Sequence, residues 1–166
     1  MALKDVLQVA GSGVTVIVGI DQVFDAVATG TGEVLFTLYD LQIAAGTFYS
    51  DGDSIEFEFA GTFADGSATQ FFIDIGGDHV LTFTAGSSVT GKGWVCRGRA
   101  LRTDVDELKV YASMVGVGFL ESQYGVVTSF DTTVPTRMSL IGTQDMSSAA
   151  CITLETGTVT FWAVRP

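Results

Sequence analysis

Apolar and polar residues alternate along most of this chain. The segment SIEFEF (54–59) puts three apolar side chains on one face and the polar ones on the other. The segment FFIDI (71–75) sets Phe71, Ile73 and Ile75 on one face in the same way. Successive side chains of a strand point to opposite faces, so this period of two predicts half-buried strands. The other segments with strand-like patterns are 14–20, 33–40, 80–85, 94–101, 108–117, 124–130, 150–155 and 158–164.

Turn-forming residues separate these segments. Gly and Asp cluster at 51–53, 64–67 and 76–79, which is typical of tight turns. The tripeptide ETG (155–157) predicts a hairpin between the last two strands. No apolar stripe with a helical period persists, and 21–28 is the only short segment that fits either a helix or a loop. About ten short strands with regular turns predict an all-β sandwich, jelly roll or barrel.

Composition supports a single folded unit. The chain has 166 residues, 47% of them hydrophobic, which is enough for one domain with a substantial core. Its 20 glycines exceed the roughly 12 expected at average usage, and with only two prolines they favour turns and bulges over linkers. We place the domain at 31–166 and expect 1–30 to be an N-terminal segment that a partner orders.

The charge balance limits the partners. Eight basic and 19 acidic residues give a net charge of −11 at pH 7. A field of this sign repels phosphate groups, so we expect binding neither to nucleic acid nor to anionic membranes. The first 20 residues include Lys4, Asp5 and Gln8, and they match neither a signal peptide nor a membrane span. This predicts synthesis in a cytoplasm.

Motifs for nucleotide, metal or nucleophilic chemistry are incomplete. GSSVTGKG (86–93) begins like a phosphate-binding loop, but Gly93 stands where the motif needs Ser or Thr, and a strand follows instead of a helix. His79 is the only histidine, so neither a zinc site nor a histidine-activated nucleophile is expected. We expect His79 at the end of a hairpin, and no metal or cofactor.

The two cysteines, Cys96 and Cys151, lie within predicted strands and form no CxxC motif. Free cysteine behaves as a small hydrophobic residue, so we interpret both as buried thiols. A single disulfide between neighbouring strands stays an alternative.

Carboxylates recur in the segment 50–83. Glu56 and Glu58 point to the same face, roughly 6.5–7 Å apart at the strand rise, which is near the separation of two carboxylates that flank a glycosidic bond. Exposed sheet faces commonly carry such pairs, so we interpret them as solvated side chains and expect no enzyme activity. Asp51, Asp53 and Asp65 suit Asx turns and form no calcium-loop motif.

Basic residues concentrate in one predicted strand. Arg97 and Arg99 share a face opposite Trp94, Cys96 and Ala100, and Arg102 follows nearby. This cluster is either a solvated face or a contact with the acidic surface of a neighbouring subunit.

The middle of the chain resembles a known pattern. The segments 35–66, 71–81 and 91–103, with their Gly-Asp turn, their GTFA corner and their Trp strand with alternating Arg, resemble structural proteins of tailed bacteriophages. That family implies an antiparallel β-sandwich of the jelly-roll (TNF-like) type and assembly as trimers. The segment IAAGTF lacks the proline that such proteins often carry there, and 104–166 lies outside the resemblance.

The resemblance implies a non-enzymatic virion protein. The first hypothesis is a capsid decoration or cement protein that binds the major capsid protein as a homotrimer; a head-fibre or tail location is implied equally. The N-terminal segment and the arginine strand are then expected to make contacts outside the subunit. Candidate contact residues are Arg97, Arg99, Arg102, Phe63, Phe72, Tyr111, Phe119, Leu3 and Val6.

Two other hypotheses use the same fold. The alternative is a carbohydrate- or receptor-binding module of a phage fibre or tail, with Tyr49 and Tyr124 as exposed aromatic platforms. In this interpretation Trp94 and Trp162 are expected in the core. The third is a β-sandwich hydrolase that uses Glu56 and Glu58.

Overall fold

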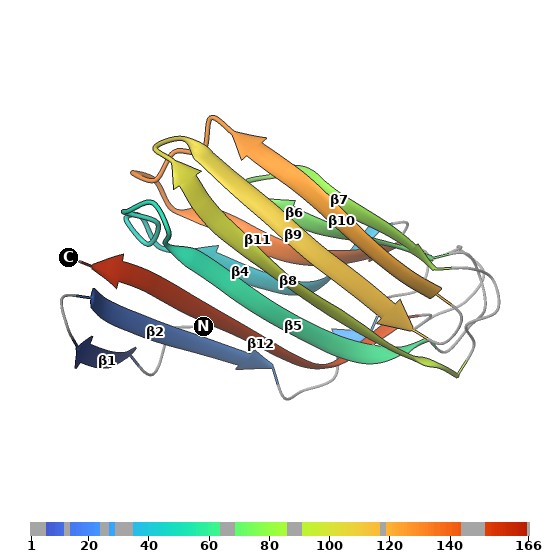
Figure 1. The fold of residues 1–166 in the computed structure, drawn as a ribbon. Helices are drawn as coiled ribbons and strands as arrows, with labels where there is room; N and C mark the ends of the chain where they lie inside the picture. Colours follow the sequence, from blue (N-terminus) through green and yellow to red (C-terminus); the bar gives the residue numbers. More distant parts are fainter. Residues whose placement is uncertain are drawn as a thin grey trace.

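The computed structural model describes residues 6–11, 14–23, 27–28, 35–63, 69–85, 91–116, 119–143 and 152–165. These residues form twelve strands in two antiparallel sheets and contain no helix, so none that is long and apolar enough to cross a membrane (Figure 1). The strands are β1 (Val6–Gly11), β2 (Val14–Val23), β3 (Val27–Ala28), β4 (Leu35–Ile43), β5 (Ser54–Phe63), β6 (Thr69–Ile75), β7 (Asp78–Ala85), β8 (Gly93–Asp104), β9 (Glu107–Gly116), β10 (Phe119–Thr128), β11 (Thr136–Thr143) and β12 (Ile152–Arg165).

The larger sheet has the order β1-β2-β12-β5-β8-β9-β10, with β3 also paired to β12. The smaller sheet has the order β4-β11-β6-β7 and lies behind it (Figure 1). The chain passes between the sheets after β3, β4, β5, β7, β10 and β11. The protein is therefore an antiparallel β-sandwich of the jelly-roll type, which confirms the fold class expected from the sequence.

The core lies between the sheets and is built from the apolar faces of the alternating strands. Phe59, Phe63, Phe71 and Trp94 are among its largest buried side chains, and the aromatic rings of Phe71 and Trp94 lie 4.9 Å apart. Cys96 is a free, buried thiol, as expected, and burial raises its pKa to about 12. Cys151 lies outside the described residues.

The expected hairpin at ETG is wrong. Residues 152–165 form one strand, β12, which pairs with β5 from Ile152 to Trp162. The register shifts between Leu154 and Thr156, so the strand continues through a bulge instead of turning back. One extra residue in a strand restores pairing after a local bend, and Glu155 in this bulge accepts a hydrogen bond from Thr62 at 2.9 Å.

The strand β11 was not expected from the sequence, although it is a central strand of the smaller sheet. Its buried face consists of Met138, Leu140 and Gly142, so the apolar alternation is short and ends on a glycine. The segment 21–28, which fitted a helix or a loop, contains the end of β2 and the strand β3 in its described part.

The N-terminal segment adds strands to the larger sheet. β2 pairs with β12 over nine residue pairs, and β1 pairs with β2 at the edge. Leu3 lies outside the described residues, and Val6 begins β1. The domain boundary after residue 30 and the ordering of this segment by a partner stay predictions.

The last strand of the larger sheet, β10, packs against β7 at the edge of the smaller sheet (Figure 1). Side chains of β10 hydrogen-bond with the backbone of β7. The Gln123 carboxamide accepts from Thr82 N at 2.9 Å and donates to Thr82 O, while Glu121 accepts from Thr84 N at 3.1 Å. These side-chain bonds join the two sheets along one side of the sandwich, although β10 and β7 do not pair as strands.

Candidate functional site

The outer face of the larger sheet carries side chains in register across five strands. The tyrosine row consists of Thr160, Glu56, Arg99, Tyr111 and Tyr124, one from each of β12, β5, β8, β9 and β10. The serine row, two residues along each strand, consists of Thr158, Glu58, Arg97, Ser113 and Ser122. Because residues two apart on a strand share a face, both rows point away from the core.

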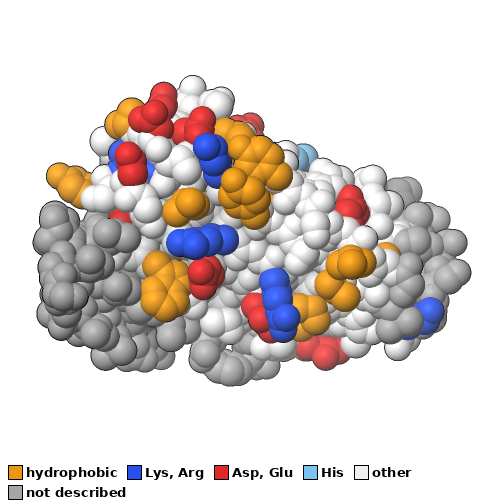
Figure 2. Space-filling view, viewed as in Figure 1, with side chains coloured by type: hydrophobic (Ala, Val, Ile, Leu, Met, Phe, Trp, Pro, Cys, Tyr) orange, Lys and Arg blue, Asp and Glu red, His pale blue; other side chains and the backbone are white. Residues whose placement is uncertain are grey.

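These rows line an open hollow of about 810 Å³, which we call the groove. Nine of the ten row residues line it, Tyr124 being the exception, and the β8 backbone at Gly98 lies between the rows. Figure 2 shows this side of the molecule, where acidic, basic and hydrophobic side chains lie interspersed. The groove is therefore a polar, charged surface bordered by aromatic residues.

Arginine and glutamate side chains pair across β5 and β8 in the groove. Arg97 donates to both carboxylate oxygens of Glu58, at 2.7 Å and 3.3 Å. Arg99 lies 3.9 Å from Glu56 and donates to Ser54 Oγ at 3.0 Å. Exposed ion pairs contribute only about 0–1 kcal/mol to stability, so the groove can exchange these contacts for contacts with a ligand at little cost to the fold.

Aromatic side chains stand at both ends of the groove. Tyr111 and Tyr124 are 48% and 53% exposed, and their rings are 4.8 Å apart. Trp162 on β12 is 38% exposed, and its indole N–H donates to Glu56 at 3.1 Å. The expectation that Trp162 belongs to the core is therefore wrong, whereas Trp94 is buried as expected.

The residues expected to contact a partner lie in different parts of the structure. Arg97, Arg99 and Tyr111 lie together in the groove. Phe63 and Arg102 are buried, so the expectation that they present a contact surface is wrong for the isolated chain. Phe63 is on the inner face of β5. Arg102 lies an even number of residues after Trp94 on β8, so its side chain points to the same inner face.

Two other expected contacts are half-buried. Phe119 packs against the core beside Phe63, with ring centres 6.1 Å apart. Phe72 stacks on His79 at 4.6 Å near the β6–β7 hairpin, which is where His79 was expected. His79 lies 3.4 Å from Asp74, whose pKa is raised by burial against the lowering effect of His79.

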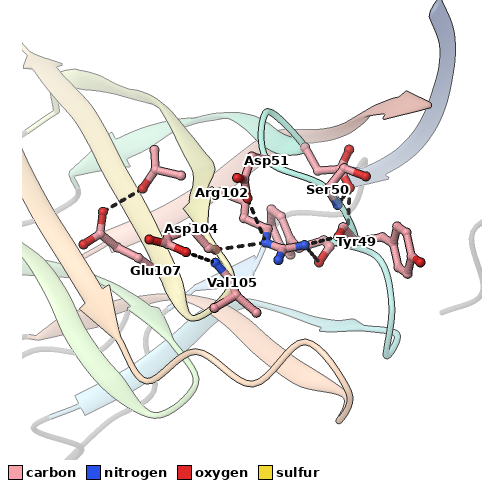
Figure 3. A network of polar contacts seen from close by, with 10 residues as sticks. Tyr49, Ser50, Asp51, Arg102, Asp104, Val105 and Glu107 are labelled. Carbon is pink, nitrogen blue, oxygen red and sulfur yellow. Dashed lines mark hydrogen bonds and ion pairs between the residues drawn. The ribbon is translucent and has the colours of Figure 1, made fainter. Parts of the chain in front are cut away.

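Arg102 organises the loop between β4 and β5 (Figure 3). Its guanidinium donates to the carbonyl oxygens of Phe48 and Tyr49, and to that of Asp104 at 2.9 Å. Asp51 lies 3.5 Å from Arg102 Nε. Arg102 is 7% exposed, so its guanidinium has a structural role in this loop.

Asp53 fixes the same loop from within. Its buried carboxylate accepts from the N–H groups of Tyr49 and Ser50 at 2.7 Å and 2.8 Å, four and three residues before it in the chain. An Asx turn bonds the N–H two residues after the Asp, so these contacts fix the loop in a different way from the Asx turn expected for Asp53. In the described parts of the chain, no group of three or more His, Cys, Asp or Glu residues is placed to hold a metal ion.

No protein-family model matches the chain, and no curated protein matches its sequence. Among solved structures, the chain is similar to peanut lectin with a nine-residue peptide, at 9% identity and a TM-score of 0.47, over 89% of this chain and 92% of that chain. It is similar to the CBM2 module of the evolved Dit of Lactobacillus casei BL23 phage J-1, at 11% identity and a TM-score of 0.39, over 76% and 70%. It is also similar to the EclA C-terminal domain, a sugar-binding protein, at 5% identity and a TM-score of 0.37, over 92% and 82%.

Sequence reasoning found part of the groove. The alternation identified the shared face of Arg97 and Arg99 and that of Glu56 and Glu58, and both faces line the groove. It missed that the two pairs oppose each other, because that depends on the register of β5 against β8. Thr158 and Thr160 were missed as well, because their positions opposite Glu58 and Glu56 depend on the register of β12 against β5.

Proposed function

We propose that the chain is a carbohydrate-binding module that holds its ligand in the groove on the outer face of the larger sheet. The observation that carries the proposal is one open hollow that combines exposed Tyr111 with paired arginines and glutamates in register, with the ring of Tyr124 packed beside that of Tyr111. Binding sites that fix orientation combine aromatic surface with a small number of polar groups.

The chemistry of the groove matches that of a sugar. A pyranose ring has an apolar C–H face, which packs on an aromatic ring, and an edge of hydroxyls that donate and accept hydrogen bonds. Arg97 supplies donors and Glu58 supplies acceptors side by side. The hydroxyls of Ser113 and Thr158 line the same hollow and can do both.

Replacing Tyr124 with alanine should weaken glycan binding by about tenfold, which corresponds to about 1.4 kcal/mol. The loss reflects the aromatic surface that packs against a sugar ring. Screening on a glycan array identifies bound glycans, and titration calorimetry with wild type and variant measures the change.

The matched control is Tyr49→Ala, because Tyr49 is 72% exposed but lies on the β4–β5 loop, where it belongs to neither row and does not line the groove. This variant should bind like wild type. Equal losses in both variants, or no glycan bound by wild type, would contradict the proposed function.

A second candidate is the capsid-decorating homotrimer in a virion that the sequence resemblance implies. One observation favours self-association: Leu120, 73% exposed, pairs with exposed Val115 across β10 and β9, beside the serine row. Exposed apolar neighbours of this kind are common at subunit interfaces.

If the chain forms this homotrimer, light scattering after gel filtration should give about three times the 17.5 kDa chain mass. A chain that stays monomeric at high concentration would remove this candidate.

A further inference from the structure

The groove is longer across the strands than along them. Its rows come from five neighbouring strands but are only two residues apart on each strand. With neighbouring strands about 4.8 Å apart and a rise of about 3.4 Å per residue, the rows are about 19 Å long and about 7 Å apart. A ligand that fills the groove is therefore extended, and it crosses the strands.

Aromatic side chains mark the two ends of this path. Tyr124 lies on β10, and Trp162 lies on β12, four strand positions away in the sheet order. Trp162 is two residues beyond Thr160 of the tyrosine row, and its indole N–H holds Glu56 of the same row. With strands about 4.8 Å apart, the two ends are about 19 Å or more from each other. One sugar ring cannot reach both.

The charges of this face are balanced in pairs. Arg97 pairs with Glu58 and Arg99 with Glu56 inside the groove, and neighbouring Lys109 lies 3.6 Å from Glu107. An anionic ligand that bound one of these arginines would leave the displaced glutamate carboxylate unpaired beside it, in a chain whose net charge of −11 also repels anions. A neutral hydroxyl-rich ligand can use the donors and acceptors without unpairing a charge.

We propose that the ligand is a linear, uncharged oligosaccharide that lies across the strands from Tyr124 to Trp162. This inference rests on the proposed function and adds to it the length, direction and charge of the ligand. Rings at the β10 end stack on the tyrosines, the central rings meet the Arg–Glu pairs, and Trp162 contacts only chains long enough to reach β12.

The test uses four series of neutral oligosaccharides (cello-, xylo-, manno- and malto-oligosaccharides, from mono- to hexasaccharide) together with oligosaccharides of hyaluronan and alginate as charged probes. Titration calorimetry on the full chain should show, for at least one neutral series, an affinity that rises at least tenfold with length and then levels off. Binding of that series should be the same at about 0.05 M and about 0.5 M NaCl.

Two variants locate the ends of the ligand. Tyr124→Ala should weaken every chain length, whereas Trp162→Ala should weaken only the longer chains, by about tenfold. Trp162→Phe keeps an aromatic ring without the indole N–H and should retain length dependence. Thermal unfolding of each variant checks that it is folded. The length dependence measured on wild type tests the proposal even if a variant does not fold.

The outcomes separate the two proposals. If a monosaccharide binds as tightly as a hexasaccharide, or only the charged probes bind, this inference is overturned while the carbohydrate-binding function stands. If Trp162→Ala weakens all lengths equally, the direction of the ligand is wrong. If none of these probes binds and the glycan array is also blank, the proposed function itself fails and this inference falls with it.

Discussion

Replacing Arg102 with alanine should lower the free energy of unfolding by about 3–5 kcal/mol. The Arg102 guanidinium is the common donor to the carbonyl oxygens of Phe48, Tyr49 and Asp104. Removing it leaves carbonyls at the base of the β4–β5 loop without their charged partner, and each buried unsatisfied group costs about 1–3 kcal/mol. Urea denaturation followed by tryptophan fluorescence and circular dichroism measures the change.

The matched control is Arg97→Ala on the same strand, β8. Arg97 makes a bidentate pair with Glu58, but both side chains are more than half exposed. This variant should lose at most about 1 kcal/mol of stability. If Arg102→Ala is no less stable than Arg97→Ala, the buried network does not hold the loop as described.

Replacing Gly61 with alanine should destabilise the fold by at least about 3 kcal/mol, or prevent it from forming. A Cβ at Gly61 would lie 1.8 Å from the backbone oxygen of Thr153 and 2.7 Å from the Trp94 ring. Backbone cannot rotate away as a side chain can, so β5 and β12 would have to separate at the bulge of β12. The yield of soluble protein and its thermal unfolding temperature measure the effect.

Gly93→Ala is the control for this position. Gly93 lies on β8, two strand positions from β12 in the sheet order, and a Cβ there would meet only the Gly61 oxygen at 3.6 Å, an ordinary contact. Its stability should change by less than about 1 kcal/mol. Similar losses at both positions would show that strand glycines in general, and not the close approach at Gly61, limit stability.

The alternation of residues predicted much of the sandwich because burial of one sheet face requires it. It identified the strands that bear Phe57, Phe71 and Trp94, and the faces that bear Glu56 and Arg97. It failed where local pattern and tertiary contacts disagree. In β11 a buried Gly142 replaces an apolar residue, and in β12 a bulge lets a turn-like tripeptide continue a strand.

The site was harder to predict than the fold because it depends on pairing between distant segments. Glu56 opposes Arg99, and Arg99 opposes Tyr111, only through the registers of β5, β8 and β9. The exposure of Trp162 follows from its position on β12, where it shares the outer face with Thr158 and Thr160, while the sequence did not show which face of the predicted strand 158–164 is buried. Likewise, the sequence grouped Arg102 with Arg97 and Arg99 as surface arginines, although its position on β8 places it on the opposite, inner face.

The contacts of Gln123 and Glu121 with β7 have a consequence for behaviour at high concentration. An edge strand normally offers a row of free amides and carbonyls that another polypeptide can extend into a growing sheet. At Thr82 and Thr84 these groups are already bonded to side chains of the same molecule. This stretch of β7 is therefore a poor template for amyloid-like stacking, and crowded copies of the protein are kept from joining along it.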